Sequence, residues 1–151
     1  MGDKVAKVRE PSWDADEIYD EATGIRQACL VCDTTLINSE SFSHHKICPV
    51  CGFHYSMSAR ERIDSIADRG TFREINRSLN SIDPLSFSSR VPYKQLLSNE
   101  QERTGMTEAV VTGNCTIGGS PATLIVLDFG FMGGSMGCVV GEKVALALEN
   151  A

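Results

Sequence analysis

Apolar and polar residues alternate with helical spacing through the middle of the chain. The stretch "SARERIDSIADRG" contains a capping box, because Ser58 precedes Glu61 by three positions, and its isoleucines then recur at helical spacing before a glycine. A second stretch, "PYKQLLSNEQERTG", starts with a proline and ends with a glycine, as many helices do. The pattern predicts that residues 57–105 are largely helical, with a break at Asp83-Pro84.

The pattern changes at Glu108 to the shorter period of β-strands. In "EAVVTGNCTIGGSPATLIVLDF", two strand-like runs flank Gly118-Gly119-Ser120-Pro121, which predicts a hairpin. The second run, residues 122–127, is almost wholly apolar and predicts a buried strand. A glycine-rich loop, "FGFMGGSMG", and a helix-spaced segment, "CVVGEKVALALENA", follow. These residues predict a strand–strand–loop–helix unit, which needs neighbours to cover both of its faces.

These patterns divide the 151 residues into three parts. Residues 1–25 lack a sustained period and are rich in acidic side chains, so we expect a flexible acidic leader. Residues 26–56 are rich in cysteine, and residues 57–151 hold the helices, the strands and the glycine loop. The apolar fraction of 42% and the charged fraction of 23% are those of a globular protein. Since no apolar run approaches the roughly 20 residues that cross a bilayer, we expect no membrane span.

The charge of the chain bears on its partners. The net charge of −6 argues against a general nucleic-acid binder, because phosphate contacts need clustered lysine and arginine. The charge is uneven, however, since acidic residues concentrate near the N-terminus and the segment 46–77 is net basic. Basic residues spread along a helix more often form a solvated face. A nucleic-acid-binding surface stays open as an alternative, and its candidate residues are Lys46, Arg60, Arg62, Arg69, Arg73 and Arg77.

Four of the six cysteines form the pattern C-x2-C-x15-C-x2-C, which is the spacing of a tetrahedral zinc site. Each pair can turn two thiolates toward one ion, and Gly52 suits the positive φ that such a turn requires. A redox motif or two disulfides fit this spacing less well. Because an all-cysteine site has no open position, we expect the zinc to be structural. The predicted ligands are Cys29, Cys32, Cys48 and Cys51.

The residues between the two cysteine pairs are long enough for a short two-stranded ribbon. Three histidines of the segment are expected to lie on its surface rather than to bind the metal. They are His44, His45 and His54.

The glycine loop is the second candidate site. A buried strand that leads into a glycine-rich loop and then a helix resembles an anion-cradling turn, in which backbone N–H groups point at the ligand. The loop matches neither of the common nucleotide-binding motifs, so close packing of the loop against the sheet stays open as the alternative. The candidate substrate-proximal residues are Gly133, Gly134 and Gly137.

The side chains around this loop predict no acid–base constellation, so the catalytic residues are unassigned. We expect Asp128 to cap the loop backbone rather than to act as a base, and Glu142 and Lys143 to be solvated or to form an intersubunit ion pair. Phe131, Met132 and Met136 are expected to pack in the core, and contact with substrate stays open as the alternative. Cys115 and Cys138 are expected to be buried or half-buried structural thiols rather than nucleophiles.

Ordered motifs along the chain resemble one known family. The four-cysteine segment is followed by "SARERID", "GTFRE", "SIDPLSF", "PYKQ", "RTGMTEAVVTG", "IGGSPA", "DFGFMGGSMGCVVGEK" and "ALALENA". From about residue 28 to residue 151 this order resembles the β subunit of the prokaryotic- or plastid-type acetyl-CoA carboxylase carboxyltransferase. The chain departs from the family at Cys138, where small residues are usual, and the family's second "GGAR"-type glycine pair has no counterpart in it.

The resemblance implies an α/β fold in which a zinc ribbon precedes the first part of a crotonase-like β-β-α superhelix. It implies transfer of a carboxyl group from carboxybiotin to acetyl-CoA, which gives malonyl-CoA for fatty-acid biosynthesis, with backbone oxyanion holes that stabilise the enolate. The implied cofactors are one Zn²⁺ per chain and biotin carried on a partner protein. The implied partners are the carboxyltransferase α subunit, the biotin carboxyl carrier protein, biotin carboxylase and a second chain that completes the β subunit.

We therefore expect the chain to correspond to the N-terminal portion of that subunit, in a truncated or split form that is active only with partner chains. The expected compartment is the cytoplasm or the chloroplast stroma. Two alternatives stay open, namely a nucleic-acid-binding zinc ribbon and a regulatory or assembly subunit without turnover.

Overall fold

The computed structural model describes residues 28–151, so the predicted leader at residues 1–25 lies outside the described residues. The chain divides into two compact units, one of which ends at Ser56 while the other spans Met57–Ala151. We call residues 28–56 the cysteine unit and Met57–Ala151 the sheet unit. Together they are a mixed α/β protein with a four-cysteine segment, as predicted.

The cysteine unit contains a short helix where the sequence predicted a ribbon. Helix α1 (Glu40–His45) begins after Ser39, whose side chain accepts the N–H of Phe42, and it ends at Lys46 in the left-handed region. The ribbon prediction is wrong for this stretch, because a serine cap followed by an acidic first turn favours a helical turn. Extended pairing is limited to two isolated bridges among the described residues of this unit, Ala28–Thr35 and Ile47–His54.

The core of the cysteine unit is small. Leu36 is buried together with Cys29 and Cys48, and Phe42 and Tyr55 pack against them. The rings of Phe42 and Tyr55 meet edge to face with centroids 5.3 Å apart. So little apolar burial gives only marginal stability to a segment of this size, which makes the clustered cysteines the main candidates for holding it together.

The sheet unit is built on an antiparallel sheet with the strand order β1-β2-β3. Its strands are β1 (Arg73–Ile75), β2 (Val110–Ile117) and β3 (Ser120–Leu127). The predicted hairpin is present, with Gly118 and Gly119 as a two-residue turn at φ of 57° and 80°. Two consecutive residues with positive φ match the right-handed twist of the flanking strands, and glycine adopts this conformation without steric cost.

The side chain of Asp68, which lies outside the hairpin, holds this turn in place. The carboxylate of Asp68 accepts hydrogen bonds from the Thr116 hydroxyl at 2.6 Å, the Gly119 N–H at 2.8 Å and the Gly118 N–H at 2.9 Å. The bond from Thr116, followed by those from Gly119 and Gly118, holds the pKa of Asp68 below its usual range. The turn is therefore fixed by a carboxylate that precedes it by some fifty positions along the chain.

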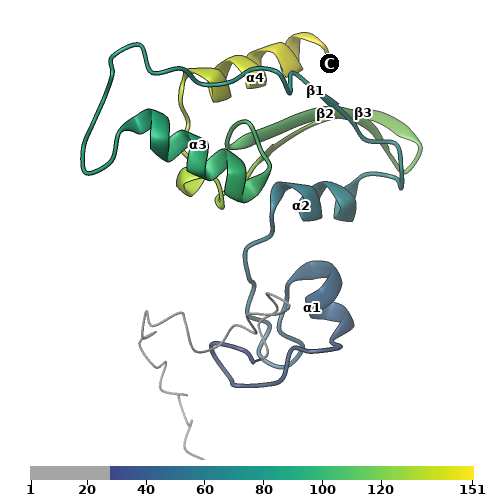
Figure 1. Cartoon of the computed structure of the whole chain (residues 1–151). Helices are drawn as coiled ribbons and strands as arrows, with labels where there is room; N and C mark the ends of the chain where they lie inside the picture. The colour runs from purple at the N-terminus through teal and green to yellow at the C-terminus, as the bar shows by residue number, and fades with distance from the viewer. Residues whose placement is uncertain (1–27) are drawn as a thin grey trace, which may run out of the picture. The chain divides into compact units, whose positions relative to one another are not determined.

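Two helices lie on opposite sides of the sheet: α2 (Ala59–Ile66) on one side and α4 (Cys138–Glu149) on the other (Figure 1). The predicted capping box at the start of α2 is present, but α2 ends at Ile66, before the glycine expected to stop it. Helix α3 (Tyr93–Thr104) follows Pro92 and ends at Gly105, as predicted. Within the described residues, no helix has the length and apolar character needed to cross a membrane.

The prediction that residues 57–105 are largely helical is wrong between α2 and α3. That stretch contains the short strand β1, which pairs with β2, and then irregular chain up to Pro92. The pairing of β1 joins residues almost forty positions apart, and no local pattern signals such a contact.

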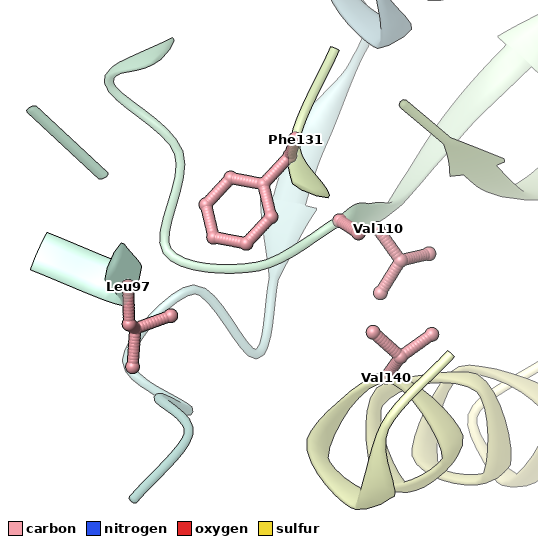
Figure 2. Packing of buried hydrophobic residues seen from close by; sticks show 5 residues of the cluster. Leu97, Val110, Phe131 and Val140 are labelled. Atoms are coloured by element: carbon pink, nitrogen blue, oxygen red, sulfur yellow. The ribbon is translucent and has the colours of Figure 1, made fainter. Parts of the chain in front are cut away.

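The core of the sheet unit lies on both faces of β2, whose neighbouring residues alternate between them. Val110 packs with Leu97, Phe131 and Val140 in one cluster, and Val110 and Val140 point toward each other (Figure 2). Val111 packs on the other face in a second cluster, with residues of α2. The strand expected to be buried, β3, is only half-buried, because it is an edge strand while β2 is central.

Candidate metal centre and glycine loop

The four predicted zinc ligands converge in the cysteine unit. Their sulfur atoms all lie within 4.8 Å of one another. The Sγ atoms of Cys29 and Cys51 are 3.7 Å apart, and those of Cys32 and Cys48 are 3.6 Å apart. A disulfide needs a separation of about 2.05 Å. Zinc–sulfur bonds of about 2.3 Å in a tetrahedron place neighbouring sulfurs about 3.8 Å apart, which is close to the separations observed.

Both cysteine pairs adopt the same backbone turn. The Asp33 N–H donates to the Cys29 carbonyl at 2.9 Å, and the Gly52 N–H donates to the Cys48 carbonyl at 3.0 Å. Both donors have positive φ, 55° for Asp33 and 70° for Gly52. The sequence predicted this conformation at Gly52 but missed Asp33, although aspartate is among the residues that tolerate it. The repeated turn aims two sulfurs from each pair toward one point.

The thiol groups of the cluster are arranged so that a bound cation would stabilise them. Burial, the largest influence on Cys29, raises the pKa of its thiol, but hydrogen bonds led by that from the Tyr55 hydroxyl lower it to about 6. The Phe53 N–H, the largest influence on Cys51, lowers the pKa of that thiol, yet burial and the three neighbouring thiols raise it to about 12. Four thiolates this close repel one another, and a bound divalent ion would stabilise all four.

The donor set fits zinc in a structural role. Four sulfur ligands fill the tetrahedron and leave no position for water or substrate. Among the residues from 28 onward, the group that could hold a metal consists of these four cysteines alone. The three histidines of the unit are exposed, as expected of residues that do not bind the metal.

The glycine loop begins at a buried carboxylate. Asp128 is only 6% exposed; its Oδ1 accepts the Gly130 N–H at 2.8 Å, and its Oδ2 accepts the Ala59 N–H at 2.6 Å. The predicted capping of the loop is therefore confirmed. The second bond was not foreseen: it satisfies one of the free N–H groups at the start of α2 and so ties that helix to the end of β3.

The three candidate glycines lie in two different settings. Gly133 and Gly134 have φ of 68° and 71° and belong to η2 (Met132–Gly134), whereas Gly137 is the N-cap of α4. No side chain caps the start of α4, and its first turn contains no acidic residue. The Gly134 N–H donates to the Phe131 carbonyl at 2.9 Å, so within the loop it is already paired. The start of α4 can still present backbone N–H groups to an anion, and the assignment of the three glycines to a substrate stays a prediction.

The last turn of α3 holds the loop from the other side. The Glu100 carboxylate accepts the Met132 N–H at 3.2 Å, and the Arg103 guanidinium donates to the Gly130 carbonyl. Glu100 and Arg103 also form an ion pair at 2.6 Å. Arg103, followed by the Met132 N–H, holds the pKa of Glu100 below its usual range. Sequence reasoning missed this clamp, because its partners lie about thirty positions apart.

Several expectations for neighbouring side chains need correction. Phe131 is buried and Met132 packs against the core as expected, but Met136 is 71% exposed. Cys115 is buried, whereas Cys138 is exposed at the start of α4. Both differences arise because residues 135–138, which connect η2 to α4 and begin that helix, are exposed on the surface.

Lys143 was expected to be solvated or to pair with another subunit, but it is only 2% exposed. It shares the buried stripe of α4 with Val140 and Ala147, at helical spacing. Its ammonium donates to the Thr107 hydroxyl at 2.9 Å, and burial lowers its pKa. Glu142 beside it is exposed, as expected.

The proposed basic surface is partly engaged within the sheet unit. Arg60 forms an ion pair with Glu74, and the Arg73 guanidinium donates to the Gly70 and Phe72 carbonyls. Two of the six basic side chains are therefore engaged within the protein and are less available to phosphate groups. This favours an ordinary solvated face over a nucleic-acid-binding surface.

Comparison with known proteins identifies clear sequence relatives. No model of a known protein family matches the chain. It is 45% identical over 123 residues to acetyl-coenzyme A carboxylase carboxyl transferase subunit beta of Thermus thermophilus, covering 82% of this chain and 43% of that protein. It is 40% identical over 132 residues to the protein of the same name from Prochlorococcus marinus, covering 87% of this chain and 45% of that protein. The chain thus spans less than half the length of these relatives.

Among solved structures, transcarboxylase 12S is 28% identical over 63% of this chain and 16% of that chain, with a TM-score of 0.47. Because this score is below 0.5, the assignment rests on the sequence relatives. The match of 123 residues is longer than Met57–Ala151, so it extends from the sheet unit into the cysteine unit.

Proposed function

Because the chain is a homologue of the N-terminal portion of acetyl-coenzyme A carboxylase carboxyl transferase subunit beta, we propose that it is part of a carboxyltransferase. The reaction is transfer of a carboxyl group from carboxybiotin on a carrier protein to acetyl-CoA, giving malonyl-CoA. The observation that carries the proposal is the length of the sequence match, which includes both units. The chain acts together with partner chains: the carboxyltransferase α subunit, the biotin carboxyl carrier protein and biotin carboxylase. Its compartment is the cytoplasm or the chloroplast stroma.

The chemistry assigned to this chain relies on backbone groups. Carboxyl transfer passes through an enolate of the acyl thioester, and preorganised N–H groups stabilise such a charge without a titrating side chain. The candidates lie around Gly133, Gly134 and Gly137, since no side chain caps the start of α4. The Gly134 N–H already donates to the Phe131 carbonyl at 2.9 Å, so the N–H groups of Gly133 and Gly137 are the stronger candidates. The clamp formed by Glu100 and Arg103 would hold these groups in place when charge develops.

The zinc ion has a separate role in this proposal. Cys29, Cys32, Cys48 and Cys51 would hold it, and the ion would supply folding energy to the cysteine unit rather than a reactive position. The substrate therefore belongs at the glycine loop and not at the metal.

A chimeric subunit tests this function. The N-terminal part of the Thermus thermophilus subunit is replaced by the matching residues of this chain, and the chimera is combined with the Thermus thermophilus α subunit. Malonyl-CoA formed from acetyl-CoA and carboxybiotin is then measured by chromatography. We expect transfer by the chimera and none by this chain alone. An assembled, zinc-loaded chimera without transfer would overturn the proposal and favour an assembly subunit without turnover.

A further inference from the structure

Helix α4 has a charged side chain on the face that it buries. Lys143 is 2% exposed and recurs at helical spacing with Val140 and Ala147, which are also buried. Lysine is almost never fully buried unless its charge is compensated, because removing an ammonium group from water costs free energy. An apolar side chain at this position would pack on the sheet without that cost. The presence of a lysine here therefore needs a reason other than the stability of the packing.

Two groups of the segment that leads into β2 compensate the ammonium. The Lys143 Nζ donates to the Thr107 hydroxyl at 2.9 Å. Burial, the largest influence, lowers the pKa of Lys143, while Glu108 and then Glu74 raise it and Arg77 lowers it. Glu108 is itself 5% exposed, and its Oε1 has no hydrogen-bond partner among the described residues. The two buried charges compensate each other, so removing either one would leave an uncompensated charge inside the protein.

Thr107 also connects α4 to α3. Its carbonyl accepts a hydrogen bond from the Gln101 Nε2 at 3.1 Å, and its hydroxyl accepts the Lys143 ammonium. The neighbouring residues Glu100 and Arg103 of α3 hold the glycine loop. The end of α3 is therefore tied to the loop that precedes α4 and, through Thr107, to the second turn of α4 itself.

The contacts of α4 differ in how well they define its orientation. Val140 packs with Val110 and Phe131, and Figure 2 shows Val110 and Val140 pointing toward each other. Apolar contacts are non-directional, so they tolerate small rotations of the helix. The hydrogen bond from Lys143 weakens steeply when its geometry changes, so it favours one rotation of α4. Because the backbone of a helix turns as one body, that rotation also fixes where the N–H groups at its start point.

We propose that Lys143 is a positioning residue: held by Thr107 and Glu108, it fixes the rotation of α4 and so aims the N–H groups at the start of that helix at the enolate of the acyl thioester. The inference rests on the function proposed above. Lys143 is buried, so it acts through the backbone of α4 and not by touching the substrate. Preorganised N–H groups stabilise charge where it develops, and a misplacement of about 1 Å can lower a rate about a hundredfold.

The test compares variants of the chimeric subunit. Lys143→Met keeps an unbranched side chain but removes the charge and the donor, and Lys143→Arg keeps both. Lys94→Met, at an exposed position of α3, is the matched control for the loss of one lysine. We expect Lys143→Met to lower kcat about ten- to hundredfold while KM for acetyl-CoA changes by less than about twofold, because the loss concerns the transition state. Lys143→Arg should recover most of kcat, and Lys94→Met should leave it unchanged.

A second comparison separates positioning from stability. Lys143→Met leaves the Glu108 carboxylate buried without its counter-charge, so it should also lower the midpoint of urea unfolding. Adding Glu108→Gln removes that charge and should restore most of the midpoint, while kcat stays low because the bond to Thr107 is still missing. Recovery of kcat together with the midpoint would show that Lys143 acts only through stability, and the proposal would be wrong. An unchanged kcat in Lys143→Met, or no recovery in a Lys143→Arg variant of native stability, would also overturn it.

The orientation of α4 can also be measured without the reaction. If the chimera with Lys143 in place assembles but transfers no carboxyl group, the proposed function fails, and the test moves to this chain loaded with zinc. Residual dipolar couplings of the backbone N–H groups of residues 137–140 report their direction. These couplings should change in Lys143→Met and stay the same in Lys94→Met. Identical couplings in both variants and the native chain would overturn the positioning role of Lys143, whatever the function of the protein.

Discussion

Replacing Asp128 by alanine should be among the most damaging single changes in the sheet unit. The carboxylate is 6% exposed and accepts two backbone N–H groups, from Ala59 at 2.6 Å and Gly130 at 2.8 Å. A hydrogen bond to a charged group contributes about 1.5–3 kcal/mol, so losing two should cost about 3–6 kcal/mol. Total stabilities of small domains are about 5–15 kcal/mol, so this loss is a large fraction of the whole. Asp128→Asn keeps one acceptor oxygen, so its free energy of unfolding should lie between those of the wild type and Asp128→Ala.

The assay is urea unfolding followed by far-ultraviolet circular dichroism, with zinc in constant excess so that the cysteine unit contributes equally in every variant. Ser58→Ala is the matched control, because it removes a side-chain cap at the same helix terminus. That cap is exposed, and its loss should cost about 1 kcal/mol. If Asp128→Ala costs no more than Ser58→Ala, the carboxylate does not tie α2 to the end of β3 as argued.

Three further changes test other parts of the structure. Cys29→Ser should abolish binding of one zinc per chain in native mass spectrometry, whereas Cys138→Ser, outside the cluster, should retain it. Asp68→Asn should flatten the acid limb of the melting temperature against pH. The pKa of Asp68 is held low by one hydroxyl and two N–H groups, so its stabilisation is complete above the unfolded pKa of about 3.9 and is lost as pH falls through the folded value. Gly113→Ala should destabilise by about 1–3 kcal/mol in urea, because its Cβ would lie 2.7 Å from a backbone oxygen, while Gly141→Ala in open space should stabilise the helix.

Features encoded by neighbouring residues were predicted well from the sequence. The capping box at Ser58 and the glycine turn of the hairpin depend on residues a few positions apart, and both are present. The spacing of the cysteines likewise predicted which four thiols come together. Local backbone chemistry decides these features, so one sequence is enough to find them.

Features that depend on distant contacts were not predictable in this way. The burial of Lys143 follows from the side of α4 that faces the sheet, and the clamp on the glycine loop joins Glu100 to a residue thirty-two positions later. The apolar pattern of β3 predicted a buried strand, but burial requires neighbours on both sides, and β3 has β2 on one side only among residues 28–151. The apolar pattern of a segment shows which side chains it can bury, but the neighbouring elements in the fold determine which of them are buried.

The central claim is that the cysteine unit holds a structural metal while the reaction takes place at the glycine loop. Exchanging the metal in the active chimera tests this claim most directly. Zinc is replaced by cadmium, which keeps four sulfur ligands, and kcat for malonyl-CoA formation is compared for the two forms at equal metal occupancy. A closed structural site should leave kcat unchanged within about a factor of two. A change in kcat of about tenfold or more, with the circular dichroism spectrum unaltered, would place the metal in the reaction and contradict the role assigned to Cys29, Cys32, Cys48 and Cys51.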